Sequence, residues 1–549
     1  MATERARGRL TAAVFVVALL VTVALGLARR SDPARARWSE TTWGALDPDA
    51  DYRRRLLTLA LAQIDSHSVE LDEFVGGGVG ARAVGPFRAL EWSAHSVQRA
   101  ASAPRAHDES ELDEAEARFA SALEVCSIVA SLAAAALVVA ASRGTAAPVD
   151  LRCAGAALLA AGVVALSPLA VAREQREALT LDACQTMLAL LQYAALGFGV
   201  RGRERIDAGL GALSGGALGG VALALGAQAW PTLAACALVW IGLAARRPRD
   251  GDRRRAWGVL LVALSAVCAF VACRGALDAG DLAPSWTALS LAECTRDPLR
   301  WALLAASLLC AWSLGTQRPR TASMTALVAS LLVAAPCAFL DERFLAVNHA
   351  ALALGSGLAL LRGSAASRNA LVSCVALLAL ALWPADSSAR LTPALEERRG
   401  LHETLAELRQ RDAAPGAFNH PGAAVDWRVA SAPRLAGPIA HRARRPVLAV
   451  EFDGRASAAA PALDDALALA DLAEFQRFAE LNGVRYVLVC RAMVLDRMER
   501  GAQRDAQMLA RWLDVETERD GWSLVHHVGR WRARDDASEL AHVALWQRR

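Results

Sequence analysis

Long apolar runs constrain this chain more than any other feature of its sequence. The first covers residues 10–28, and the others lie near 121–142, 151–172, 183–200, 206–226, 229–245, 256–273, 299–315, 322–340, 346–362 and 369–384. Each is about 17 to 22 residues long, enough for an α-helix to cross the ~30 Å hydrocarbon core of a bilayer. The sequence therefore predicts a mainly α, polytopic membrane bundle of eleven helices.

The composition favours a membrane protein with polar parts. Hydrophobic residues make up 54% of the 549 residues and aromatic residues only 5%, which is too apolar for an ordinary soluble enzyme. The formal net charge is +4 and the chain has arginine but no lysine, so we expect no nucleic-acid partner. The spacing of the 11 cysteines predicts neither a disulfide framework nor a zinc site.

The first run could be a signal peptide or a first span. Arg5, Arg7 and Arg9 precede it, as they would in either case. Arg29 and Arg30 follow it directly, with no small-x-small cleavage site before them. This arrangement favours an uncleaved span.

Arginine clusters give the expected orientation, because arginine near span ends is retained in the cytoplasm. The clusters at 201–205, 246–255 and 317–320, and the pair Arg362 and Arg368, fall on alternate connections on the N-terminal side. An odd number of spans then places the C-terminus outside. The sequence predicts a multi-pass protein of a bacterial inner (plasma) membrane.

Two domains follow from this topology. Residues 1–384 form the predicted transmembrane domain, with a large first extracytoplasmic loop over 30–120. Residues 385–549 form the predicted soluble domain, which lies on the periplasmic side.

The predicted periplasmic domain is a small α/β domain. Strands are expected over 445–452 and 484–490, and an amphipathic helix over 464–481 that Asn482 and Gly483 end. A helix over 492–513 and strands over 522–531 and 542–547 complete it.

Four ionisable residues fall on the predicted outer side. Asp47 follows the first span, Asp182 begins the fourth apolar run, Glu293 lies between two runs and Arg343 stands on a very short connection. Asp47 could instead be a solvated loop residue or cap, and Asp182 a helix N-cap. Arg343 could pair with a neighbouring acid, Asp341 or Glu342. A carboxylate such as Glu293 is costly beside the membrane unless it is paired or metal-bound.

Together, the four residues suggest a chemistry that none of them suggests alone. Asp47, Asp182 and Glu293 could hold a hard divalent cation such as Mn²⁺ or Mg²⁺, or activate an acceptor as carboxylates. Arg343 could bind a phosphate through its planar fork of N–H groups. Cleavage of a sugar from a lipid-linked diphosphate needs such a set, because negative charge develops on the leaving group.

The first loop and the acidic positions resemble those of the catalytic subunits of oligosaccharyltransferases, which belong to the C-type (GT-C) membrane glycosyltransferases. That family has Asp-Pro, three residues, then Tyr-Arg in its first loop, and Asp47-Pro48 and Tyr52-Arg53 match this spacing. Its second acidic motif, often Asp-His-His, corresponds to Asp182-Ala183-Cys184, without the histidines. Glu293 matches a glutamate late in a later outer loop, and Arg343-Phe344 matches an Arg-Phe of a subsequent loop.

The tail resembles bacterial relatives at two strands and departs from them at one motif. Arg444–Val447 match the family's Arg-Arg-Pro-Val, and Gly483, Arg485, Tyr486, Val487 and Val489 match its second strand. The tryptophan-rich motif that grips the hydroxyl of an Asn-x-Ser/Thr acceptor would fall at Arg434–Gly437. No Trp or Asp stands there, and Asp426-Trp427 is the nearest remnant.

The resemblance implies an inverting, metal-dependent glycosyltransferase. It would move a sugar or oligosaccharide from a polyprenyl-phosphate or diphosphate carrier in the membrane to an extracytoplasmic protein or glycan acceptor. Asp47, Asp182 and Glu293 would be the catalytic and metal-binding residues, and Arg343, Tyr52 and Arg53 would bind the substrate. Two alternatives stay open: a GT-C single-sugar transferase acting on lipid or polysaccharide, and a catalytically degenerate homologue or scaffold.

Overall fold

The computed structural model describes part of the chain in detail. The described residues are 2–30, 53–54, 57, 92–94, 96–97, 109–142, 150–167, 169, 171, 179–201, 205–245, 253–273, 294–295, 297–317, 322–362, 388–411 and 428–549, except 444, 446, 450, 453–454, 457–459, 470, 516–518, 520 and 533–538 within the last range. The chain divides into two compact units, one of residues 1–36 and 117–384 and one of residues 37–116 and 385–549. We call them the helical unit and the tail unit.

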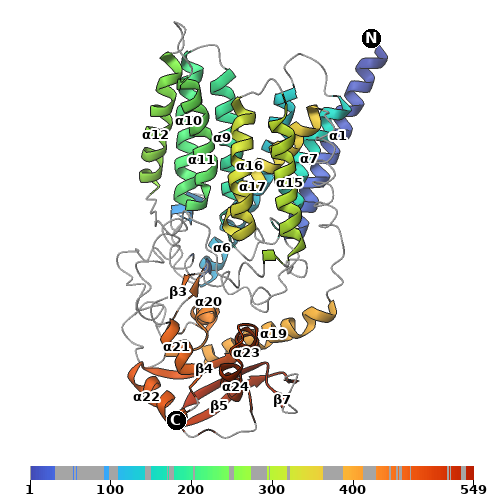
Figure 1. The fold of residues 1–549 in the computed structure, drawn as a ribbon. Coiled ribbons are helices and arrows are strands. Elements are labelled where there is room, and N and C mark those ends of the chain that lie inside the picture. Colours follow the sequence, from blue (N-terminus) through green and yellow to red (C-terminus); the bar gives the residue numbers. More distant parts are fainter. Residues whose placement is uncertain are drawn as a thin grey trace. The chain divides into compact units, whose positions relative to one another are not determined.

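The apolar runs form helices that lie side by side in the helical unit (Figure 1). Their bounds are α1 (Ala2–Arg30), α6 (Glu109–Ser142), α7 (Leu151–Leu166), α9 (Asp182–Arg201), α10 (Arg205–Leu225), η1 (Ala227–Ala229), α11 (Trp230–Ala245), α12 (Arg253–Ala272), α15 (Pro298–Gly315), α16 (Ala322–Leu340), η2 (Glu342–Phe344) and α17 (Leu345–Arg362). Ten of the predicted runs coincide with helices, and the eleventh, 369–384, lies outside the described residues.

Six of the described helices are long and apolar enough to cross a membrane, by length and composition. They contain Leu10–Arg30, Glu114–Ser142, Asp182–Arg201, Ile206–Leu225, Pro298–Gly315 and Glu342–Leu361. Four further apolar segments are shorter: Leu151–Leu166, Ala227–Leu243, Trp257–Ala272 and Met324–Leu340. The chain is therefore a multi-pass membrane protein.

Local sequence explains where several helices begin. Asp150 caps α7, because its carboxylate accepts a hydrogen bond from the Cys153 amide at 2.7 Å. Asp297 caps α15 in the same way through Leu299, and Pro298 occupies the first helical position. A side-chain acceptor at this position satisfies an amide that the helix itself leaves without a partner.

Helix α17 forms the centre of the helical unit. Its apolar window is 83% buried, whereas that of α1 is 6% buried, and α17 packs against α7, α9, α15 and α16. Helices α10 and α12 approach closely, because Gly216 and Gly220 lie against the backbone of α12 at Val262 and Ala266. Small residues four positions apart allow such close packing between helices in a bilayer.

The tail unit contains a four-stranded mixed sheet in the order β1-β4-β8-β5. The strands are β1 (Arg428–Ala430), β4 (Val484–Cys490), β5 (Trp522–Val528) and β8 (Val543–Arg548). β1 runs parallel to β4, and β8 is antiparallel to both β4 and β5. The pairs β2 (Glu451–Phe452) with β3 (Arg455–Ala456) and β6 (Trp531–Arg532) with β7 (Glu539–Leu540) are separate.

Helices and an aromatic cluster complete the tail unit. The helical elements are α19 (Ser388–Gln410), η5 (Pro433–Leu435), α20 (Ala436–Pro438), η6 (Ile439–Ala443), α21 (Ala460–Leu467), α22 (Leu472–Leu481), α23 (Arg491–Glu499) and α24 (Gln503–Arg511). Helix α19 packs on β5 and β8. The ring centroid of Trp512 lies 5.2 Å from that of Phe475, 5.7 Å from that of Trp522 and 6.1 Å from that of Trp546.

Three predictions for the tail were wrong in detail. The predicted strand over 445–452 is not continuous: within its described residues, only a bridge from Val447 to Val429 and the short β2 have strand pairing. The predicted helix over 464–481 is two helices, because Asp471 begins a new one by capping α22 through Ala473. The predicted helix over 492–513 is also two, separated at Gly501, whose φ of 78° does not continue a right-handed helix.

Candidate functional site

Buried polar side chains gather at the end of the helical unit where α9 and α17 begin. We call this region the polar end; its buried members are Arg30, Ser167, Asp182, Gln185, Thr186, Asp341, Arg343 and His349. Thr186 in α9 donates to the carbonyl of Ala346 in α17 at 3.2 Å. Gln228 in η1 donates to Gln185 at 3.2 Å. These bonds join the starts of α9, α11 and α17.

Two more bonds connect α1 and α7 to the same region. The hydroxyl of Ser167 lies 2.6 Å from Nε2 of His349, and Arg30 donates to the carbonyls of Ala165 and Val164 at 2.8 and 3.1 Å. His349 also interacts electrostatically with Asp182. Sequence reasoning missed this network, because its members lie on helices far apart in the chain.

Asp182 is the first residue of α9 and is only 5% exposed. A carboxylate in the first turn of a helix is stabilised by the helix dipole. The beginning of α9 packs against the beginning of α17, where Thr186 is bonded to Ala346. The fold thus brings Asp182 to the part of the bundle that carries Arg343.

Arg343 forms an ion pair with Asp341. The sequence allowed this pairing as an alternative to a phosphate-binding role. Its Nη2 lies 2.7 Å from Oδ2 of Asp341, and its Nε lies 3.0 and 3.1 Å from the two carboxylate oxygens. Asp341 also caps η2 by accepting from the Arg343 amide at 2.9 Å. Arg343 is 7% exposed, so the structure holds its guanidinium in one orientation.

A second arginine supports the same short helix. Arg300 in α15 pairs with Glu342 in η2, and its Nε lies 3.5 Å from Asp297. Arg300 also donates to the carbonyl of Phe339 at 3.1 Å. Sequence reasoning did not single out Arg300, although Arg300 and Asp297 both stand beside the start of an apolar run.

The other predicted site residues are only partly described. Asp47, Tyr52 and Glu293 lie outside the described residues, and Arg53 is half-buried. Among the residues that the structure describes, no three His, Cys, Asp or Glu side chains are grouped to hold a metal ion. The three-carboxylate metal site stays a prediction, because two of its three members lie outside that part of the chain.

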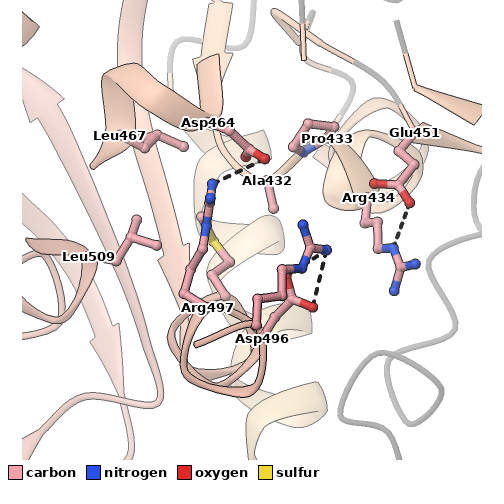
Figure 2. A pocket seen from close by; sticks show the side chains of 11 residues that line it. Ala432, Pro433, Arg434, Glu451, Asp464, Leu467, Asp496, Arg497 and Leu509 are labelled. Atoms are coloured by element: carbon pink, nitrogen blue, oxygen red, sulfur yellow. Dashed lines mark hydrogen bonds and ion pairs between the residues drawn. The ribbon is translucent and has the colours of Figure 1, made fainter. Parts of the chain in front are cut away.

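The tail unit contains a charged pocket with about 420 Å³ of empty space, its mouth included (Figure 2). Three ion pairs surround it: Arg434 with Glu451 at 2.9 Å, Arg497 with Asp464 at 3.1 Å, and Arg500 with Asp496 at 2.9 Å. Ala432, Pro433, Leu467, Met493 and Leu509 provide its less polar walls.

Asp464 is the most perturbed charge in that pocket. Burial raises the pKa of its carboxyl, and the nearby Glu451 and Asp496 raise it further. Arg497 and Arg500 oppose these effects. The pocket therefore places carboxylates and guanidinium groups together, a combination that can both accept and donate hydrogen bonds to a polar ligand.

Comparison with solved structures finds the same fold over nearly the whole chain. The apo oligosaccharyltransferase of Archaeoglobus fulgidus matches with a TM-score of 0.59 and 12% identity, covering 98% of this chain and 88% of that one. Its complex with Zn and sulfate matches with a TM-score of 0.57 and 12% identity, over 97% and 88%. The archaeal oligosaccharyltransferase AglB from the same organism, with an inhibitory peptide and a dolichol-phosphate, gives 0.52 and 13%, over 91% and 72%.

Sequence comparison gives no such match. The sequence matches no protein-family model and no curated protein. Because the sequence identity to these structures is only about 12%, the structural likeness shows the fold alone. The chain therefore has the oligosaccharyltransferase-like GT-C fold, with a C-terminal α/β domain.

Proposed function

We propose that this protein is a membrane glycosyltransferase that moves a sugar or oligosaccharide from a polyprenyl-phosphate or diphosphate carrier to an extracytoplasmic acceptor. The observation that carries the proposal is the length of the structural match, which covers 98% of this chain and 88% of an oligosaccharyltransferase. A match confined to the apolar helices would have much less weight, because helical bundles host many functions.

The proposed catalytic and metal-binding residues are Asp47, Asp182 and Glu293. Asp182 fits this role because it is a buried carboxylate at the start of α9, which is bonded through Thr186 to the start of α17. A set of three carboxylates suits Mg²⁺ or Mn²⁺, which prefer oxygen ligands. A cation bound there would neutralise the negative charge that develops on the leaving phosphate.

We propose that Arg343 binds the leaving phosphate and that Tyr52 and Arg53 are further substrate-binding residues. The guanidinium of Arg343 is already fixed by Asp341, so it loses little side-chain freedom when a substrate binds. Its Nε and Nη2 donate to Asp341, and the other edge of the guanidinium, formed by Nη1 and Nη2, can bind two oxygens of one phosphate. The sugar then leaves the phosphate as the acceptor attacks from the opposite side, which inverts the anomeric centre.

The residues at 434–437 of the tail favour an acceptor that is not an Asn-x-Ser/Thr sequence. Arg434 at this position is paired with Glu451, and Leu435, Ala436 and Gly437 are buried. No tryptophan or aspartate stands there to grip a hydroxyl group. This favours as second candidate a GT-C enzyme that moves a single sugar to lipid or polysaccharide.

The membrane orientation belongs to the same proposal. We place the polar end and the tail unit on the periplasmic side of a bacterial inner membrane, because arginine clusters occupy the opposite connections. The donor would then reach the polar end from the outer leaflet.

The test is transfer and hydrolysis of a labelled polyprenyl-linked sugar by the purified protein, with Mn²⁺ or Mg²⁺ and with a chelator. We expect the chelator to abolish turnover and Asp182→Asn to lower it by roughly 100-fold or more. The matched control is Asp150→Asn, the same change at the cap of α7, where asparagine still offers an oxygen to the Cys153 amide, so that stability and turnover should both stay near normal.

A panel of peptide, lipid and glycan acceptors then separates the two candidates. Transfer only to a peptide supports the oligosaccharyltransferase-like reaction, and transfer only to lipid or glycan supports the second candidate. A well-folded protein without turnover on any carrier would instead indicate a catalytically degenerate homologue.

A further inference from the structure

Two cysteines on different helices meet at the polar end. Cys126 lies in α6 and Cys184 lies in the first turn of α9, 58 residues further along the chain. Their sulfur atoms are 3.1 Å apart. Neither forms a disulfide bond in this structure, and both side chains are only partly buried.

The position of Cys126 along α6 places it near the membrane surface. Helix α6 has 34 residues, about 51 Å at 1.5 Å per residue, while the hydrocarbon core is ~30 Å thick. The charged residues Glu114, Glu116, Arg118 and Glu124 all precede Cys126, so this part of α6 extends beyond the core. Cys184 is two residues from Asp182, at the start of α9.

We propose that Cys126 and Cys184 form a disulfide bond in the mature protein. A disulfide has a sulfur–sulfur distance of about 2.05 Å, so the two atoms need to approach by only ~1 Å. The proposal rests on the periplasmic placement of the polar end proposed above, because disulfides persist in oxidising compartments such as the bacterial periplasm.

The reaction is a thiol–disulfide exchange with a protein that carries a reactive disulfide. One thiolate attacks that disulfide and forms a mixed disulfide, and the second thiolate attacks the sulfur of the first cysteine and releases the donor as a dithiol. The two cysteines lose two electrons and two protons, and the donor disulfide gains them. No other reactant is required.

The bond would fix the turn of α9 that carries Asp182. This turn is already held to α17 through Thr186 and to η1 through Gln185, and the disulfide would add a covalent link to α6. Three other elements of the bundle, α17, η1 and α6, would then define the position of the Asp182 carboxylate.

The sequence allows an unambiguous test by mass spectrometry. Trypsin cuts after Arg118 and Arg143 and after Arg176 and Arg201, so that the fragments 119–143 and 177–201 each contain one cysteine. Cells are treated with N-ethylmaleimide to block free thiols, and the full-length protein is digested without reductant. We expect the two fragments to be joined, and to separate on reduction.

Three single variants serve as comparisons. Cys126→Ser and Cys184→Ser should each abolish the joined fragment and leave the other cysteine alkylated. Cys268→Ser, which removes an exposed thiol of α12, should leave the joined fragment unchanged. The apparent melting temperature of the wild type should fall on reduction, and that of Cys184→Ser should not.

Full alkylation of both cysteines in cells overturns the proposal. Treatment of the reduced, purified protein with diamide then shows the reason: formation of the bond only there means that the orientation is wrong, and no bond at all means that the geometry is wrong. None of these measurements depends on sugar transfer, so failure of the proposed activity and failure of the disulfide are distinguishable.

Discussion

At the scale of single residues, the ion pair between Arg343 and Asp341 allows two different roles to be separated. Arg343→Lys keeps the positive charge but loses the planar fork, and Arg343→Ala loses both. If Arg343 binds the donor phosphate, Arg343→Ala should weaken donor use about ten- to hundredfold, as expected for a charge-assisted hydrogen bond of about 1.5–3 kcal/mol. Arg343→Lys should have a smaller effect of the same kind.

Donor titrations and melting curves on both variants test this prediction. Removing one partner of a buried ion pair is destabilising. If the role of Arg343 is purely structural, its replacement should therefore lower the melting temperature and leave donor use unchanged. Wild-type donor dependence in a folded Arg343→Ala protein would remove Arg343 from the substrate site.

Glu397 in α19 gives a second prediction, which concerns pH. Burial raises the pKa of its carboxyl to about 7, against the opposing effects of the hydrogen bond from the Ala492 amide and of Arg491. Its Oε1 accepts that amide hydrogen bond at 2.5 Å. The side chain is buried beside the Cys490 thiol, an environment that disfavours a charged carboxylate.

The sign of the effect follows from the two pKa values. The folded tail retains the proton up to about pH 7, whereas the unfolded chain releases it near the ordinary value of 4.5. The tail should therefore lose stability as the pH rises from about 4.5 to about 7, by on the order of 3 kcal/mol, and lose no more above that. Glu397→Gln should remove this dependence.

Hydrogen exchange of fragments from α23, in wild type and Glu397→Gln at each pH, measures the difference. Comparison at equal pH cancels the intrinsic exchange rates. A protection ratio that is constant between pH 4.5 and 7 would exclude Glu397 as the titrating group.

At the scale of helices and strands, Gly483 offers a direct test of local sequence. It follows α22 with a φ of 63°, the left-handed conformation in which glycine commonly ends a helix. Gly483→Ala should destabilise the tail by about 1–2 kcal/mol, because a Cβ is unfavourable there. Gly483→Asn should cost less, since asparagine tolerates this conformation.

Protection of the β4 amides against hydrogen exchange is the measurement, because β4 begins at the next residue. Protection equal to that of the wild type in both variants would mean that the φ of Gly483 does not constrain folding.

Most of the elements were predictable, because length and hydrophobic periodicity are local properties. The predicted strand over 484–490 has the observed bounds, and the run predicted over 183–200 is a helix from Asp182 to Arg201. The run predicted over 151–172 gives a helix that ends at Leu166, because Pro168 follows and the residue before a proline disfavours helical geometry.

The candidate site was less predictable, because its contacts depend on packing. The partner of Arg343 is two residues away and could be anticipated from the sequence. Ser167 and His349 are 182 residues apart, and Cys126 and Cys184 are 58 apart. No local pattern connects such residues, and only the arrangement of the helices brings them together.

At the scale of the whole molecule, the eleven-span topology expected from the sequence makes a simple prediction. Reporter fusions after residues 205, 255 and 320 should be cytoplasmic, since arginine clusters stand at these connections. Fusions after 120, 298 and 400 should be periplasmic. A cytoplasmic result at 400 would separate the tail from the first loop that carries Asp47 and exclude a site that they share.

The bond from Arg30 to α7 also has a consequence for biosynthesis. Arg30 ends α1, and the carbonyls that it binds are about 135 residues further along the chain. A ribosome adds ~5–20 residues per second, so α1 waits roughly 7 to 27 s in the membrane before its partner has been made. Helix α1 must therefore be stably inserted by its own apolar surface, and α7 later recruits it into the bundle.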